Sequence, residues 1–570
     1  MLTHTFPFRQ LPRWLLQVAL PALLCMCVPG CSDGNRSENL DAEPPVVRCP
    51  YGAPEAGGTV VYVAASGTDS DGCGTSTATP CATIGRGIAQ CGAAGCAVAV
   101  RHGIYLTTES ITLRDAVNVH GSCLFGDEPD MPYRTVIDAA PPAGMPAIDA
   151  TGIGSATVVS GLLVLGKDET APGEASVAMR VRASKGLTLQ LVTLSAGRGG
   201  DGAPGSSAKG GAGGDGGSPA GWSPSDYGAG GLACPSRPDA GRGKGGTGRE
   251  AVRFTTDSCP LIDCKCWPIP SALPASELTG QDSGAAKGGG KGGDGDFGGS
   301  CTGRVRPFDP TPGNGGMGLN GQVGDCSQAG GQRASGPNDT GNIIAGRWTG
   351  TISRQGGDGG TGSGGGGGGG GGYGAYISFA PPPTLFYGFP GGGGGGGGCG
   401  GPGGGGGQQG GASISLILAD SSIGNLASGA NIIAGPGGAG GAGGSGGLGG
   451  PGGAGGLPYN GQQVSRSFPL GPVLLPGFGG MGARGGAGGA GAGGAAGNGG
   501  PSIGIALIGN SADPGQDGIH AGQAGVPGKG GSGMTNPIEP GSANSQCRSA
   551  DGADGLPGTA VATARFQEGS

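Results

Sequence analysis

The chain has 570 residues, of which 146 are glycine and 45 are proline, and its formal net charge is −7 at pH 7. Aromatic residues make up only 4% and charged residues 12%, so one large conventional hydrophobic core is excluded, and the low charge differs from that of ordinary disordered chains. The modest negative charge, without a basic run, predicts no nucleic-acid partner.

Residues 1–31 have the pattern of a bacterial export signal. Two arginines precede the apolar run 14–28, which is interrupted by a proline and is short for a membrane-spanning helix. The run leads into Val28-Pro29-Gly30-Cys31, which resembles the lipobox of bacterial lipoproteins.

This resemblance implies that Cys31 is lipidated, for example with palmitate, and becomes the first mature residue. Residues 32–56 then form a flexible tether, and the serine after Cys31 is compatible with the outer membrane of a Gram-negative bacterium. The expected partner is therefore a membrane, reached through a lipid anchor. An ordinary cleaved signal followed by a structural cysteine is the alternative.

The segment 57–196 predicts an all-β domain with one short helix. A β-branched apolar strand covers 59–65, and Ile84 and Ile88 lie four residues apart in a helical pattern over 82–91. Short alternating strands follow within 97–103, 109–115, 116–121, 134–139, 146–150, 157–166, 177–183 and 187–197. A sandwich, a barrel and a stacked solenoid each fit this spacing.

A resemblance selects the solenoid. The residues that carry it are Val61-Tyr62-Val63, Ser66-Gly67-Thr68-Asp69, Cys73-Gly74, Pro80-Cys81, Thr83-Ile84, Val98, Val100, Gly103-Ile104-Tyr105 and the run 158–165. Together they resemble the start of a pectin-lyase-like right-handed parallel β-helix, in which a strand and a short helix cap the first coil. A capped end suits a solenoid, because its open end needs a cover.

The rest of the chain alternates glycine tracts with apolar segments. In 435–457 a non-glycine residue stands at every third place, and a period of three is that of an extended polyproline-II-type helix. The apolar segments 176–197, 412–435 and 501–522 each end in Ala-Gly before a tract. They are interpreted as successive coils of one β-helix, with the tracts as excursions from an equivalent corner.

The predicted division after 57–196 has four parts. These are excursions over 197–411, with a cysteine-rich loop at 233–273; a coil at 412–435; an excursion over 436–500; and the last coils, a short tract and a tail over 501–570. A packed bundle of polyproline-II-like helices and a disordered linker are the main alternatives for the tracts. Collagen fits less well, and so does a calcium-binding nonapeptide roll, which the runs 210–215 and 289–294 suggest. In composition and period the tracts resemble the glycine-rich regions of mycobacterial PE-PGRS surface proteins.

The cysteines indicate disulfides in an oxidising compartment. Outside the export signal there are 14 cysteines (17 in the whole chain), an even number. Close candidate pairs are Cys73 with Cys81, and Cys91 with Cys96; Cys301 with Cys326 is a further candidate pair. Staples of an irregular loop are expected from Cys234, Cys259, Cys264 and Cys266.

Catalytic chemistry is poorly represented. In the pectin-lyase-like superfamily, hydrolases use paired carboxylates, and lyases use acidic residues that bind calcium together with a basic residue that abstracts a proton. The strands of this chain offer only Asp138 and Asp149 as a candidate pair. The sequence contains no histidine and cysteine spacing typical of a metal site and no nucleophile motif. Asp69–Gly72 has the pattern of a plain turn. No catalytic residue, metal or cofactor is predicted.

The sequence therefore predicts a non-catalytic cell-envelope lipoprotein. It would be a structural, adhesive or ligand-presenting surface module, with a polysaccharide or another envelope component as its partner. The alternative is a polysaccharide lyase or glycoside hydrolase of the pectin-lyase-like superfamily. A third hypothesis is that the tracts bind a regular surface such as ice or a crystalline polymer.

Overall fold

The protein is described from a computed structural model. Its chain divides into residues 1–46 and a second unit, Val47–Ser570, to which every described residue belongs. The described residues are 47–49, 58–92, 95–126, 134–207, 229–232, 326, 328, 330–332, 341–358, 374–375, 385–386, 391–424, 426, 429–458, 480–515, 517–536 and 547–567. The predicted signal, Cys31 and the cysteine-rich loop lie outside them.

The described part contains one short helix and otherwise strands, so the all-β prediction is confirmed. The elements are β1 (Val47–Arg48), β2 (Val60–Val63), α1 (Ile84–Gln90), β3 (Cys96–Arg101), β4 (Gly103–Thr107), β5 (Ile111–Thr112), β6 (Val117–Phe125), β7 (Thr135–Ala139), β8 (Pro146–Thr151), β9 (Thr157–Ser160), β10 (Leu162–Leu165), β11 (Ser176–Arg182), β12 (Leu187–Gln190), β13 (Thr193–Ser195), β14 (Asn342–Ile344), β15 (Arg347–Thr349), β16 (Gly374–Ala375), β17 (Leu385–Phe386), β18 (Ser413–Ala419), β19 (Asn431–Ile433), β20 (Ser502–Ile508), β21 (Ile519–His520) and β22 (Ala560–Phe566).

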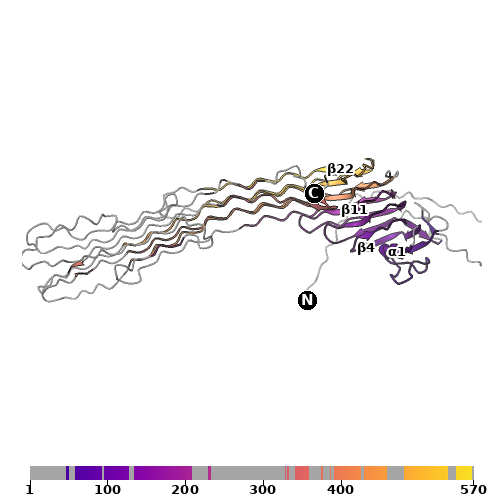
Figure 1. The fold of residues 1–570 in the computed structure, drawn as a ribbon, viewed down its shortest axis with the longest axis horizontal. Coiled ribbons are helices and arrows are strands. Elements are labelled where there is room, and N and C mark those ends of the chain that lie inside the picture. Colours follow the sequence, from indigo (N-terminus) through magenta and orange to yellow (C-terminus); the bar gives the residue numbers. More distant parts are fainter. Residues whose placement is uncertain are drawn as a thin grey trace, which may run out of the picture. The chain divides into compact units, whose positions relative to one another are not determined.

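Most strands belong to three sheets whose main ladders are parallel (Figure 1). The first sheet has the order β12-β9-β6-β3-β2, with β1 antiparallel to β6; the second has the order β21-β19-β13-β10-β7-β4; the third has the order β22-β20-β18-β11-β8-β5. From β3 to β13, successive strands of the chain belong to the first, second and third sheets in a repeating order. Each visit adds one strand beside the preceding strand of the same sheet.

The core consists of columns of like side chains that the parallel registers stack. In the second sheet Ile137, Val164, Leu194, Ile432 and Ile519 are successive register partners, and all are buried. A similar column in the third sheet joins Ile148, Met179, Leu416 and Ile505, and both columns belong to one apolar cluster. Burial of these columns is the main favourable term that holds the sheets together.

A hairpin covers part of the outer face of the third sheet. Its strands β14 and β15 pair antiparallel, and their Ile343 and Trp348 are buried in a second apolar cluster with Val177, Ile414 and Ile503. The part of the third sheet formed by β18 and β20 is therefore apolar on both faces, which explains why these two strands are nearly continuous runs of apolar residues.

Six described glycine-rich tracts leave and rejoin the sheets at the same step of the strand cycle. We number them in chain order as first (197–207), second (391–411), third (435–458), fourth (480–501), fifth (521–536) and sixth (547–559). Odd-numbered tracts follow the second-sheet strands β13, β19 and β21; even-numbered tracts lead into the third-sheet strands β18, β20 and β22. The tracts run side by side (Figure 1).

Backbone hydrogen bonds join these tracts in steps of three residues. Between the third and second tracts, the nitrogens of Gly438, Gly441 and Gly444 donate to the carbonyl oxygens of Gly411, Gln408 and Gly405, at 2.8–2.9 Å. The series continues to Gly456, whose nitrogen donates to the Gly393 oxygen at 2.7 Å. Because one number rises as the other falls, these two tracts are antiparallel.

The fourth tract joins the others in the same way. It accepts bonds from the second tract in a parallel series, from Gly392 to the Gly480 oxygen through Gly410 to the Asn498 oxygen. It also donates in an antiparallel series to the third tract, from Gly482 to Gly500. Many backbone polar groups of these extended chains are thereby paired without a β-ladder.

Two runs that the sequence presents as single strands are divided in the structure. The run 157–166 is split into β9 and β10 at Gly161, and the run 187–197 into β12 and β13 around Leu191. Gly161 has φ of 65° and Leu191 has φ of 53°. A left-handed residue at each place turns the chain from the first sheet into the second.

Candidate binding groove beside the N-terminal helix

A groove lies between the start of α1 and the first strands of the second and third sheets. Its cavity volume is about 570 Å³, and it is lined by Ala65, by residues 82–86 and by residues 104–111. That volume is within the usual range of ligand sites, about 300–1,000 Å³. We call this feature the cap groove.

The helical wall of the cap groove is fixed by Asp69. Its carboxylate accepts hydrogen bonds from the nitrogens of Ala82 (2.7 Å) and Thr83 (3.0 Å) and from the Thr83 hydroxyl (2.7 Å). Thr83 is the N-cap residue of α1 and accepts from the nitrogen of Arg86 at 3.2 Å. These bonds satisfy donors that a helix start otherwise leaves free.

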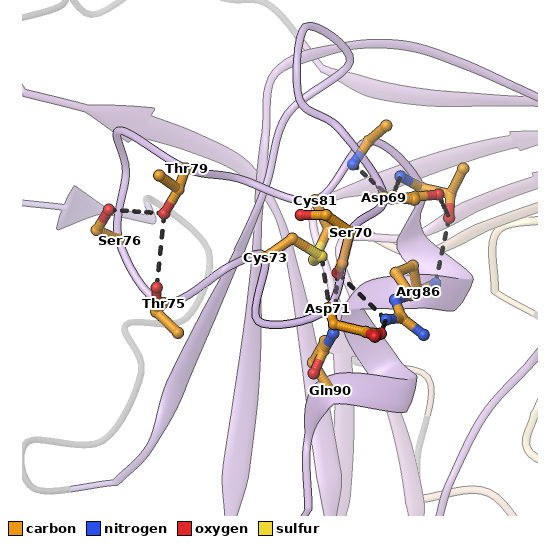
Figure 2. Close-up of a disulfide and its surroundings, with 12 residues drawn as sticks. Asp69, Ser70, Asp71, Cys73, Thr75, Ser76, Thr79, Cys81, Arg86 and Gln90 are labelled. Carbon is orange, nitrogen blue, oxygen red and sulfur yellow. Dashed lines mark hydrogen bonds and ion pairs between the residues drawn. A yellow bond between two sulfur atoms is a disulfide. The ribbon is translucent and has the colours of Figure 1, made fainter.

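A disulfide and an ion pair hold the loop that carries Asp69. Cys73 is bonded to Cys81, and Arg86 donates to the Asp71 carboxylate at 2.6 Å and to the Ser70 carbonyl at 3.1 Å (Figure 2). The disulfide thus closes the loop, and Arg86 attaches the loop to the groove wall.

The opposite wall is β4, whose side chains alternate between core and groove. Tyr105 points inward, and its hydroxyl donates to the carbonyl oxygens of Arg101 (2.9 Å) and Val63 (3.3 Å). Burial of the phenol raises the pKa of Tyr105. Ile104 and Leu106 face outward and are 63% and 76% exposed, which is unusual for aliphatic side chains in a strand.

The cap groove has little acid–base or metal-binding capacity. Glu109 is the single carboxylate among the described lining residues. Asp69, Cys73 and Cys81 lie close enough to suggest a metal cluster, but the two sulfurs form a disulfide and the carboxylate already accepts three hydrogen bonds. Metal-binding cysteines are thiolates, so this cluster supports a structural turn.

The structure places the candidate cysteines as follows. Cys73 is bonded to Cys81 and Cys91 to Cys96. The expectation for Cys326 is wrong, because its partner is Cys547, 221 residues away, and not Cys301. Cys301 and the expected loop staples lie outside the described residues; the latter are Cys234, Cys259, Cys264 and Cys266.

Sequence reasoning missed three bonded cysteines besides Cys547. Cys49 is bonded to Cys123, 74 residues away, beside the antiparallel pair of β1 and β6. Cys399, within the second tract, is also disulfide-bonded. The even total pointed to pairing, but long sequence separations depend on the folded arrangement and leave no local pattern.

The candidate acid pair is not brought together as a site. Asp138 lies on β7 of the second sheet, whereas Asp149 lies on β8 of the third. Asp149 binds Arg180 through two contacts, Nε at 3.2 Å and Nη2 at 2.7 Å. This bidentate pair bridges β8 and β11 and is a structural contact.

The contacts of His120, like those of Asp149, are typical of a structural residue. It is buried, and its Nδ1 lies 2.9 Å from the hydroxyl oxygen of Ser160 on the neighbouring strand β9. Burial lowers the pKa of His120, because a charged imidazole is poorly solvated inside the sheets.

Comparisons with known proteins give little to add. No family model and no curated protein matches the chain. A solved structure described as a rhamnogalacturonan lyase is similar over 25% of this chain and 36% of that chain, with 14% identity and a TM-score of 0.18. A likeness of that size carries no argument. Among the described residues, no helix is both long enough and apolar enough to cross a membrane.

Proposed function

We propose that the stacked sheets form a right-handed parallel β-helix from which polyproline-II-like helices grow as excursions. The repeated visit to three sheets in the same order supports this architecture. The three-residue steps of the hydrogen bonds between tracts support the polyproline-II period. The excursions would leave one corner of the coil, between its second and third sheets.

We further propose that the protein is exported and is anchored to the cell envelope through a lipid on Cys31, in the outer membrane of a Gram-negative bacterium. The lipobox-like residues Val28-Pro29-Gly30-Cys31 support this location. The disulfides of the described part also support it, because such bonds persist in oxidising compartments.

We infer that the protein is a non-catalytic surface module that presents a binding surface to an envelope component. The observation that carries this inference is how the described carboxylates are used. Asp69, Asp115 and Asp551 accept bonds from backbone nitrogens, and Asp149 and Glu174 pair with arginines. Glycoside hydrolases instead need a pair of carboxylates that flank the bond to be cleaved.

An activity assay tests this inference. The purified full chain is incubated with pectate, rhamnogalacturonan and related glycans, with and without calcium, and reducing ends and unsaturated products are measured. We expect no release above a heated control. Turnover that is lost in a variant of a carboxylate, such as Glu109→Gln, would show that the protein is an enzyme instead.

A further inference from the structure

The strand β4 ends the second sheet, and the described residues place no strand beside its other edge. In a parallel ladder the N–H and C=O of one residue point to the same neighbour, and those of the next residue point the opposite way. The nitrogen of Gly103 donates to the Arg134 oxygen at 3.4 Å, and the oxygen of Thr107 accepts from the Ala140 nitrogen at 2.7 Å. Alternate residues from Gly103 to Thr107 therefore face β7.

It follows that Ile104 and Leu106 direct their backbone N–H and C=O away from β7. Both residues line the cap groove, so the open edge of the sheet and the cavity occupy the same place. The described hydrogen bonds include none to these four backbone groups. Two residues of a strand span about 6.6 Å, which sets the spacing of the two open positions.

Natural edge strands are commonly protected by charged residues, proline, bulges or a covering element. The sequence of β4, Gly-Ile-Tyr-Leu-Thr, contains neither a charge nor a proline. Its pairing with β7 is in continuous register from Gly103 to Thr107. Among the described residues, the edge instead carries the exposed side chains of Ile104 and Leu106, while Tyr105 is buried and its hydroxyl is hydrogen-bonded to backbone carbonyl oxygens.

We propose that the cap groove binds an extended peptide segment, which adds to the second sheet as a new strand beside β4. This inference rests on the proposed role as a surface module and names the chemistry of its partner. A polypeptide offers paired N–H and C=O groups at the repeat of Ile104 and Leu106, whereas the hydroxyls, ring oxygens and carboxylates of an acidic glycan do not form such pairs at that repeat. Backbone bonds provide affinity, and apolar side chains at alternate positions of the peptide pack on Ile104 and Leu106.

The test uses a phage-displayed library of random dodecapeptides selected on the full chain with its disulfides intact. We expect enriched peptides with apolar residues at alternate positions. On binding of a synthetic selected peptide, amide exchange should slow at Ile104 and Leu106, while Tyr105, already paired with β7, changes little.

A backbone variant separates strand addition from apolar contact. Leu106→Pro removes an N–H that faces away from β7, so the existing ladder keeps its donors; we expect affinity to fall at least tenfold. Leu106→Thr keeps the backbone donor and should lose less. If Leu106→Pro alters folding, seen as faster exchange at Ile137 and Val164, Leu106→Lys replaces it, because it blocks the edge without touching the backbone.

Three outcomes would overturn the proposal: no enriched peptide, exchange protection away from β4, or unchanged affinity in the edge variants. Protection of the cap groove by a glycan instead of a peptide would also overturn it. These outcomes would contradict peptide binding but not the proposed non-catalytic role. Glycan cleavage in the activity assay would contradict the non-catalytic role, but it would not decide whether peptides bind beside β4.

Discussion

Gly441 lies where a β-carbon would be 2.1 Å from the carbonyl oxygen of Ala203 in the first tract. Its neighbour Gly440 has the same relation to the oxygen of Gly497 in the fourth tract. The next residue, Ala442, is exposed. The third tract thus has two faces closed by other backbones and one open face, which is the physical reason for its two glycines in every three residues.

At this scale we predict that Gly441→Ala destabilises the tracts locally. The added methyl group meets backbone on another tract, and overpacking of this kind costs about 1–3 kcal/mol. The measurement is amide exchange at Gly444 and Gly497, whose nitrogens donate hydrogen bonds between the same tracts, to the oxygens of Gly405 and Gly441. Ala442→Ser, on the open face, is the matched control and should exchange like the wild type; equal effects of the two variants would contradict the packing explanation.

At the scale of the element, α1 shows how a short helix is held by groups outside it. It has seven residues, with no acidic residue in its first turn and no basic residue in its last turn. An isolated helix of that length is not stable in water. The Asp69 carboxylate, the Cys73–Cys81 disulfide and the buried Ile84 and Ile88 supply what the helix itself lacks.

We therefore predict that Asp69→Ala loosens α1 and the cap groove. The change removes three hydrogen bonds to a charged group, a loss of roughly 1–3 kcal/mol. Faster amide exchange at Gly87 and Ile88, compared with Val98, measures it. Asp71→Ala is the control from the same loop, because it removes only an ion pair with a fully exposed carboxylate, and exposed pairs contribute little. If Asp71→Ala loosens the helix equally, the capping explanation is wrong.

Particular elements show what the sequence could and could not predict. The helix over 82–91 and the alternating strands followed from local patterns, because burial on one face leaves a readable period. The division at Leu191 did not follow, since a left-handed backbone at leucine leaves no compositional signal. The cap groove also escaped prediction: no strand is predicted over Gly103–Thr107, and only the folded order of strands makes β4 an edge.

At the scale of the whole molecule, the proposed location of the protein depends on Cys31, a residue outside the described part. We predict that cells expressing the wild type incorporate labelled palmitate into the protein, and that Cys31→Ser abolishes the label and shifts the protein to the soluble fraction. A diacyl or triacyl anchor on one cysteine holds a protein at a membrane without a membrane-spanning segment. Cys27→Ser, within the apolar run, is the control and should keep the label; loss of the label only in that variant would place the modification elsewhere.

The three-residue step of the hydrogen bonds also limits which changes in tract length preserve the packing. Inserting three residues into the third tract moves every later donor to the next equivalent position, so glycines still face the second and fourth tracts. Inserting one or two residues would turn side chains such as that of Leu448, which is exposed, into faces where a backbone lies in contact. Tract length can therefore grow or shrink in triplets, while the residues on the open face remain free to change.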